Sequence, residues 1–115
     1  MPTLKSKGVY VGELEQLILL MVLRLGNGEA YANPIREDLD KVAGRRIARG
    51  ALYTALERLE QKGCLRSTMG EPLPERGGRP RRYFTVTPTG LRALRHARRI
   101  LLGLWDGLEA KLETS

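Results

Sequence analysis

The stretch RGALYTALERLEQKGCLRSTM (residues 49–69) changes its pattern at Gly63. Before that glycine, Leu52, Leu56 and Leu59 recur at the three- and four-residue steps of one helical face. After it the helical period stops, and residues 64–69 predict a short strand. We therefore expect a helix that ends at Gly63 and leads directly into a β-strand.

A second strand is predicted at RYFTVT (82–87), where Phe84 and Val86 are expected to complete the core. The intervening segment GEPLPERGGRPR (70–81) holds three prolines and three glycines, which we interpret as excluding helix. The two strands therefore form a hairpin with a long basic tip. The alternative is that this tip is a flexible, solvated loop with no binding role.

Two helices are predicted upstream. GELEQLILLMVLRLGNG (12–28) is apolar nearly all round and closes on glycines, which is typical of the central helix of a domain. In YANPIREDLDKVAG (31–44), Asn33 is the expected N-cap and Pro34 the first helical residue. The apolar positions of this second helix are Ile35, Leu39 and Val42.

The last helix is expected to begin after the cap Thr87, with Pro88 as its first residue, and to run about 25 residues to the C-terminus. Its apolar residues alternate three- and four-residue steps, the spacing of a helix that buries a seam against another helix. Trp105 is expected to anchor this interface, with contact to a ligand as the alternative. The predicted dimer interface comprises Leu91, Leu94, Leu101, Leu104, Trp105 and Leu108.

These elements predict a mainly α fold with a small β-hairpin. The expected arrangement is a winged helix-turn-helix domain over residues 9–87, followed by a long C-terminal dimerisation helix over residues 88–115. Together they are expected to form one compact unit. No apolar run approaches the roughly 20 residues of a membrane span, so we expect no membrane contact and a cytoplasmic location. Cys64 is expected to be a small buried hydrophobe, with a thiol sensor as the alternative. His96 is expected to be solvated, and no metal or cofactor is expected.

Positive charge is concentrated in one part of the chain. The net charge is +7, yet residues 45–99 carry 14 basic and 4 acidic side chains, while the rest of the chain is acidic. A basic region within a helix-turn-helix arrangement favours a polyanionic partner.

The segments RGALYTALERLEQKGCLRS, GEPLPERGGRPRRYFTVTPTGLRALR and GELEQLILLMVLRLG together resemble the PadR family of bacterial transcriptional regulators. The resemblance implies a homodimer that binds a double-stranded DNA operator, usually as a repressor, under control of a signal such as a small molecule. It also implies, from aromatic residues on the last helix of some relatives, a small hydrophobic or aromatic effector. Two positions depart from the pattern of many relatives: Thr54 stands where they carry proline, and Ala48 where they carry a Ser or Thr cap.

The third helix and the hairpin tip hold the expected DNA contacts. Gly50 and Thr54 give the helix a narrow leading end that suits the major groove, and basic side chains beside its N-terminus attract phosphate. Glycines at the tip allow arginines to follow the backbone or to enter a narrow minor groove. Packing of Tyr53 on the second helix and simple solvation of the arginines are the alternatives. The predicted DNA-binding residues are Arg45, Arg46, Arg49, Gly50, Tyr53, Thr54, Arg58, Arg76, Gly78, Arg79 and Arg81.

Other classes of function have less support. An enzyme is not expected, because the chain has one His and one Cys and shows neither a phosphate-binding loop nor a recognisable acid–base pair. Aromatics make up only 5% of residues, which disfavours a single-stranded RNA reader. A winged-helix adaptor that binds proteins without specific DNA binding is the alternative function. The operator, the effector and the direction of regulation are not encoded in any motif.

Overall fold

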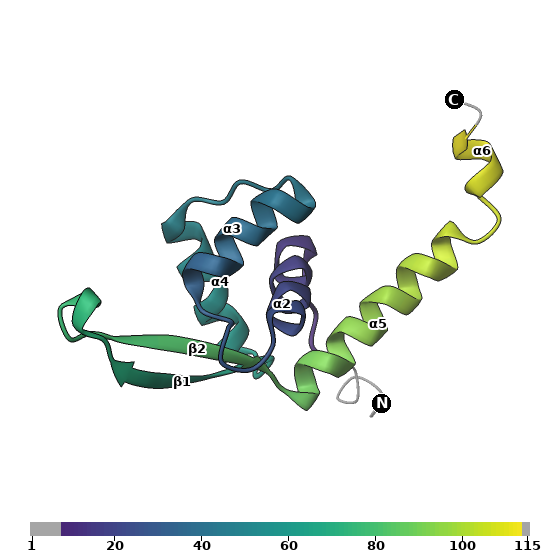
Figure 1. The fold of residues 1–115 in the computed structure, drawn as a ribbon. Helices are drawn as coiled ribbons and strands as arrows, with labels where there is room; N and C mark the ends of the chain where they lie inside the picture. The colour runs from purple at the N-terminus through teal and green to yellow at the C-terminus, as the bar shows by residue number, and fades with distance from the viewer. Residues whose placement is uncertain (1–7, 114–115) are drawn as a thin grey trace.

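The computed structural model describes residues 8–113; the side chain of Arg76 is outside this description. Three helices precede a two-stranded hairpin, and two further helices follow it (Figure 1). In chain order the elements are α2 (Glu13–Leu25), α3 (Ala32–Ala43), α4 (Arg49–Gln61), β1 (Leu65–Pro72), a 3-10 turn (Pro74–Arg76), β2 (Pro80–Val86), α5 (Pro88–Trp105) and α6 (Glu109–Glu113).

The core lies where α2, α3, α4 and the base of the hairpin meet. Its fully buried side chains come from all of these elements, and α2 supplies Ile18 and Leu19 at its centre. The prediction of α2 as the central helix is confirmed in this respect, and Gly26 ends it with φ of 86°. Leu20 and Leu23 are nevertheless each 46% exposed, because the described residues do not cover one side of α2.

The start of α3 was predicted two residues too late. The N-cap is Tyr31, and Asn33 lies within the first turn. Pro34 fits there because the first backbone N–H groups of a helix have no acceptor within the helix. Val42 is 62% exposed, so its predicted place on the apolar face was also wrong. Its position in the last turn carries it past the core that Ile35 and Leu39 enter.

The hairpin is antiparallel, with Leu65 paired to Val86 at its base and Pro72 to Pro80 near its tip. Both strands are longer than predicted, and the tip contains one 3-10 turn where helix had been excluded. Proline can open such a turn because its fixed φ suits the first position and no N–H donor is needed there. Phe84 and Val86 are buried as predicted, and the backbone N–H of Phe84 donates to the carbonyl of Ala30 at 2.8 Å.

The predicted 25-residue C-terminal helix is interrupted. Thr87 caps α5 as expected, but the helix ends at Trp105, where Asp106 takes ψ of 126° and Gly107 takes φ of 82°. That left-handed glycine redirects the chain into the short helix α6.

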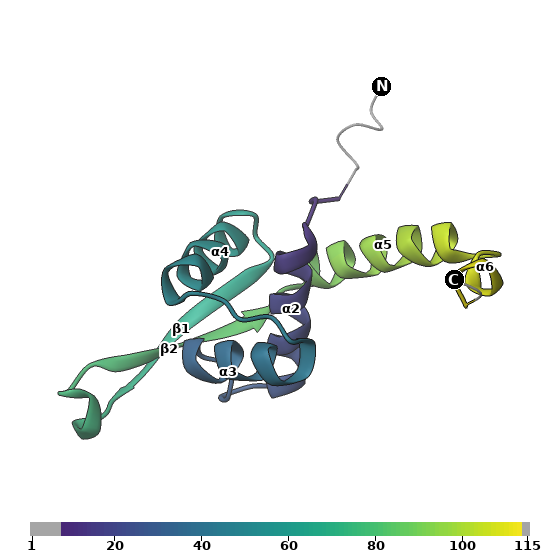
Figure 2. The same cartoon turned by 90° about the horizontal axis from the view of Figure 1, so that it is seen from above.

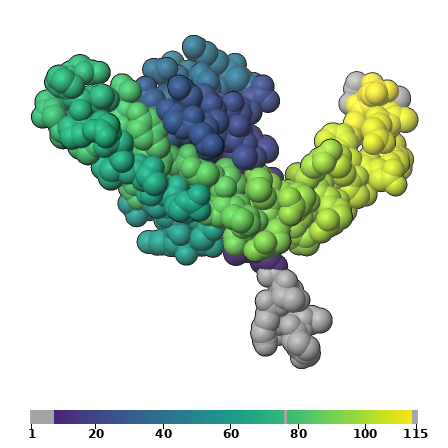
Figure 3. All heavy atoms as spheres, turned by 60° about the horizontal axis from the view of Figure 1, so that its bottom comes forward, coloured from purple at the N-terminus to yellow at the C-terminus, as the bar shows by residue number. Residues whose placement is uncertain are grey.

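Two projections leave the body of the molecule. The hairpin tip extends on one side and α5 with α6 on the other, as the ribbon and the space-filling view both show (Figures 2 and 3). Gly90 and Ala93 are buried at the start of α5, whereas every residue from 100 to 113 is exposed. Within residues 8–113, none of the helices has the length and hydropathy needed to cross a membrane.

Candidate nucleic-acid interface

One face of α4 is exposed to solvent. Leu52, Ala55, Leu56 and Leu59 point into the core. The opposite face is exposed, as the 3.6-residue period predicts. Its members are Gly50, Tyr53, Thr54, Glu57, Arg58 and Gln61.

Tyr53 and Gly50 give this face its shape. Tyr53 is 42% exposed, so its ring is not buried against α3. A Cβ atom placed on Gly50 would meet no atom of the described residues within 4 Å. The face is therefore narrow at its leading end and carries a phenol hydroxyl at its flank.

The N-terminus of α4 is open. Its N-cap is Ala48, as predicted, and within residues 8–113 this cap supplies no side-chain hydrogen bond to the first N–H groups of the helix. These donors and the positive end of the helix dipole are available to an anion.

The three arginines before this end are held differently. Arg45 Nη1 donates to Glu13 Oε1 at 3.0 Å, which holds the guanidinium against the start of α2. Arg46 Nε lies 3.9 Å from Asp40 Oδ2, but its side chain is 88% exposed. Arg49 is exposed on the first turn of α4. Arg46 and Arg49 are therefore the more accessible cations of this group.

Sequence reasoning missed the residue that fixes the connector between α3 and α4. Arg36 Nε donates to the carbonyl of Ile47 at 2.8 Å, and Ile47 is buried. Its position on the polar side of the predicted second helix carried no distinguishing signal.

The tip of the hairpin is accessible. Gly77 and Gly78 both have positive φ, and Gly78 and Arg79 are exposed. The predicted contact through the side chain of Arg76 lies outside the described part of the chain. The positive φ angles of Gly77 and Gly78 form the turn that leads to Arg79.

Arg81 belongs to β2 rather than to the tip. Its guanidinium lies 4.3 Å from the ring centroid of Tyr31, a cation–π contact with the residue that precedes α3. Its Nε is buried and has no hydrogen-bond partner in the described residues. A hydrogen bond with Tyr83 raises the pKa of Arg81 above its ordinary value, so the side chain remains charged. One face of this cation is thus occupied within the chain.

Arg82, which was not among the predicted site residues, faces α4. Its Nε donates to Ser67 Oγ at 3.1 Å, and its Nη1 donates to Glu57 Oε2 at 3.4 Å. Its Nη2 donates to Glu60 Oε1. Strand alternation puts neighbours on opposite faces, and this was the available signal that Arg81 and Arg82 differ.

A second candidate surface runs along α5. Leu91 and Leu94 are half-buried against the core, whereas Leu101, Leu104, Trp105 and Leu108 are 41–68% exposed. A cavity of about 480 Å³ lies between α2 and α5. Its apolar lining is Leu20, Leu23, Leu91, Leu94, Leu101, Leu102 and Trp105.

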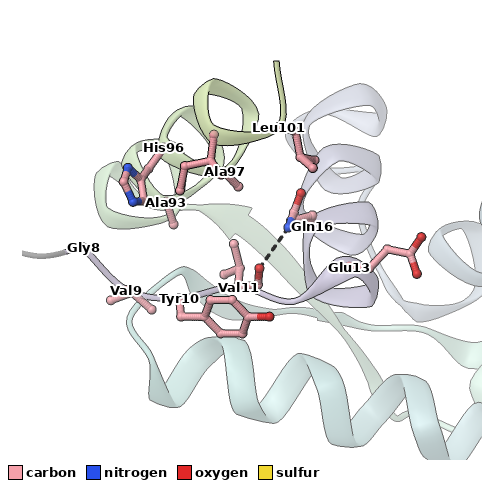
Figure 4. A pocket seen from close by; sticks show the side chains of 11 residues that line it. Gly8, Val9, Tyr10, Val11, Glu13, Gln16, Ala93, His96, Ala97 and Leu101 are labelled. Carbon is pink, nitrogen blue, oxygen red and sulfur yellow. Dashed lines mark hydrogen bonds between the residues drawn. The ribbon is translucent and has the colours of Figure 1, made fainter. Parts of the chain in front are cut away.

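A further cavity of about 600 Å³ separates residues 8–11 from α5. Figure 4 shows the ring of Tyr10 on one side of it and His96 and Ala97 on the other. Gln16 Nε2 donates to the carbonyl of Val11 at 2.9 Å and so ties this segment to α2. His96 is exposed as predicted, and among the described residues no group of His, Cys, Asp and Glu could hold a metal.

Comparisons with known proteins agree with this architecture. A family model described as the transcriptional regulator PadR-like family matches residues 19–96. A PadR family transcriptional regulator from Eggerthella lenta is 32% identical, covers 89% of this chain and 88% of that chain, and gives a TM-score of 0.65. A transcriptional regulator from Clostridium thermocellum is 22% identical over 84% of this chain and 90% of that chain, with a TM-score of 0.67, and supports the fold.

A curated relative is much longer than this chain. An uncharacterized 37.1 kDa protein in transposon Tn4556 of Streptomyces fradiae is 36% identical over 72 residues, which is 63% of this chain. The match spans 19% of the length of that relative.

Proposed function

Because the chain belongs to the PadR-like family of transcriptional regulators, we propose that it is a homodimeric repressor that binds a pseudo-palindromic operator in double-stranded DNA. The observation that carries the proposal is the exposed face of α4, whose N-terminus is uncapped and flanked by Arg46 and Arg49. Family membership supports the class of function, a transcriptional regulator, and this face of α4 is the surface that we propose contacts DNA.

In this proposal α4 enters the major groove with its N-terminal end leading. Gly50 lets the backbone approach the base edges, and Thr54 offers a hydroxyl one turn later. Arg46, Arg49 and the free N–H groups of α4 contact phosphates. Tyr53 and Arg58 extend these contacts along the flanks of the helix.

The hairpin is the wing of this interface. Arg79 reaches the DNA backbone or a narrow minor groove, and the turn at Gly78 permits the approach. The backbone of the 3-10 turn places Arg76 at the same tip. Arg81 is best tested separately from Arg79, because Tyr31 occupies one face of its guanidinium.

The dimer is proposed to form along α5. The exposed apolar side chains from Leu101 to Leu108 need a covering surface, and a second copy of the chain provides one. A two-fold axis there would place two α4 helices on half-sites about 10 base pairs apart, or a multiple of that spacing. A small aromatic effector bound beside Trp105 would alter that spacing.

The direct test measures affinity for duplex genomic fragments against salt concentration. We expect Arg49→Ala to weaken binding and to reduce the slope of log affinity against log salt by about one. Lys111→Ala removes the same charge from α6, far from α4, and should retain the slope (Figure 1). Equal binding of genomic and random duplexes, unaffected by Arg49→Ala, would instead favour a protein adaptor.

A further inference from the structure

Arg82 connects both strands of the hairpin to α4. From β2, its guanidinium reaches Ser67 on β1 and two carboxylates one turn apart on α4, those of Glu57 and Glu60. Ser67 Oγ also donates to Glu60 Oε2 at 2.7 Å. The four side chains therefore form one closed network between the hairpin and the helix that carries the proposed base contacts.

The network is partly shielded from water. The side chains of Arg82 and Glu60 are 33% and 24% exposed, and the Arg82 guanidinium lies 5.3 Å from the ring centroid of buried Phe84. A planar guanidinium offers several donors in a fixed geometry, so it fixes direction as well as distance. A lysine ammonium at the same place would keep the charge without that geometry.

The opposite face of the hairpin is held by aromatic contacts. Tyr83 packs edge-on against Tyr31, with ring centroids 5.6 Å apart, and Arg81 lies over the same Tyr31 ring. Gly70 makes room for Tyr83, because a Cβ there would lie 2.6 Å from Cε2 of its ring. Consecutive arginines of β2 thus attach the hairpin to α4 on one face and to the start of α3 on the other.

A two-stranded hairpin does not hold its own orientation in water, since two strands are at best marginally stable alone. Its angle to α4 must come from contacts with the helices. The Arg82 network joins α4 to the hairpin at the Met69–Arg82 pair, so its loss would let the strands rotate about their base and would displace Arg79 at the tip.

We propose that Arg82, held by Glu60, Glu57 and Ser67, is a positioning residue that sets the angle of the wing to α4 so that both reach DNA together. The inference rests on the proposed DNA binding and deepens it. Arg82 acts through the wing and does not itself supply a phosphate contact.

The sharpest test is Glu60→Gln. A simple effect of net charge and the anchoring of Arg82 predict opposite changes in DNA affinity for this variant. Removing a carboxylate beside a DNA-binding face raises the net charge by one, and electrostatics alone would strengthen binding. If Glu60 instead anchors Arg82, the variant binds more weakly and its salt slope falls by about one, because the wing contact is lost.

A double-mutant cycle shows whether the loss of DNA affinity in Glu60→Gln arises from the wing contact of Arg79. Arg79→Ala should weaken binding less in the Glu60→Gln background than in the native chain, because the same contact is already impaired. Arg82→Lys should reproduce the effect of Glu60→Gln while keeping the charge. Glu71→Gln is the matched control, since it removes an exposed carboxylate from β1 that has no ion pair in the described residues.

The outcomes separate the inference from the proposed function. Native protein that shows no salt-dependent binding to duplex DNA would contradict the proposed function itself. If the native chain binds but Glu60→Gln matches Glu71→Gln in affinity and slope, or its effect adds fully to that of Arg79→Ala, the positioning role is wrong. Melting curves check that each variant remains folded, and Arg82→Lys decides the matter if Glu60→Gln does not.

Discussion

At Gly90, α5 passes close to the base of the hairpin. A Cβ atom there would lie 2.4 Å from the carbonyl oxygen of Cys64 and 2.8 Å from Cγ1 of Val86. Because one of these neighbours is backbone, the strain cannot be relieved by a rotamer change. We expect Gly90→Ala to lower the free energy of unfolding by about 1–3 kcal/mol, measured by urea denaturation.

Gly50→Ala is the control for this substitution. It adds the same methyl group to a helix where no atom of the described residues lies within 4 Å. Its stability should be unchanged or higher by up to about 1 kcal/mol. Equal losses in the two variants would show that close packing at Gly90 is not the cause.

The buried thiol of Cys64 makes the stability of the fold depend on pH. Desolvation raises the pKa of its thiol, opposed in part by the positive charge of Lys62. Above the ordinary thiol pKa of about 8.5, the unfolded chain releases a proton that the folded chain retains, so stability falls as pH rises. The contribution is complete below that pH and is lost as pH approaches the raised folded value.

Comparison with Cys64→Ala isolates this effect from the titration of other groups. The alanine variant is expected to be less stable at about pH 7, because it leaves a cavity. Its deficit should shrink toward about pH 10, because only the native chain has the thiol linkage. Urea midpoints across this range measure the deficit, and a constant difference would contradict the linkage.

At the scale of elements, Thr87 joins α5 to the end of α4. Its Oγ1 accepts a hydrogen bond from the N–H of Gly90 at 3.1 Å and donates to the carbonyl of Gly63 at 2.5 Å. It therefore caps α5 and also ties that helix to the end of α4. We expect Thr87→Ala to lower the free energy of unfolding by about 1–2 kcal/mol.

Thr87→Ser keeps the hydroxyl and should lose about 0.5 kcal/mol or less. Urea denaturation of both variants provides the measurement. A serine variant as unstable as the alanine variant would mean that the methyl group of Thr87, rather than its hydrogen bonds, is what matters.

Local signals in the sequence predicted most elements for identifiable physical reasons. The leucine period of α4 and its stop at Gly63 depend on neighbours in the chain, and both are confirmed. The end of α5 at Trp105 was missed because the apolar spacing continues through Leu108, whereas the backbone turn depends on the conformation of Gly107. A side-chain pattern does not report that conformation.

The candidate interface was predictable in part. The exposure of Gly50 and Thr54 follows from helical geometry alone. Strand alternation likewise indicates that Arg81 and Arg82 lie on opposite faces of β2. It does not indicate which of the two meets α4, because tertiary packing decides that. The count of charges along the chain therefore indicated the basic region, but it did not single out Arg82 as the residue that orients the wing.

At the scale of the whole molecule, α5 and α6 form an arm with exposed apolar side chains from residue 100 onward. Leu104 is 68% exposed and contributes little to the fold of a single chain. We expect Leu104→Glu to leave the helical content unchanged and to convert a dimer into monomers, because a buried carboxylate without a partner is costly. Light scattering measures the mass, and circular dichroism measures the helical content.

The same variant tests whether DNA affinity depends on pairing. Two linked half-sites bind more tightly than one because the second contact is intramolecular, so the monomer should lose about 100-fold or more in affinity for a two-half-site operator. Leu104→Met keeps the apolar volume and should retain both the dimer mass and the affinity. A Leu104→Glu protein that remains dimeric would place the interface elsewhere, and a monomer with full affinity would mean that each chain recognises its site alone.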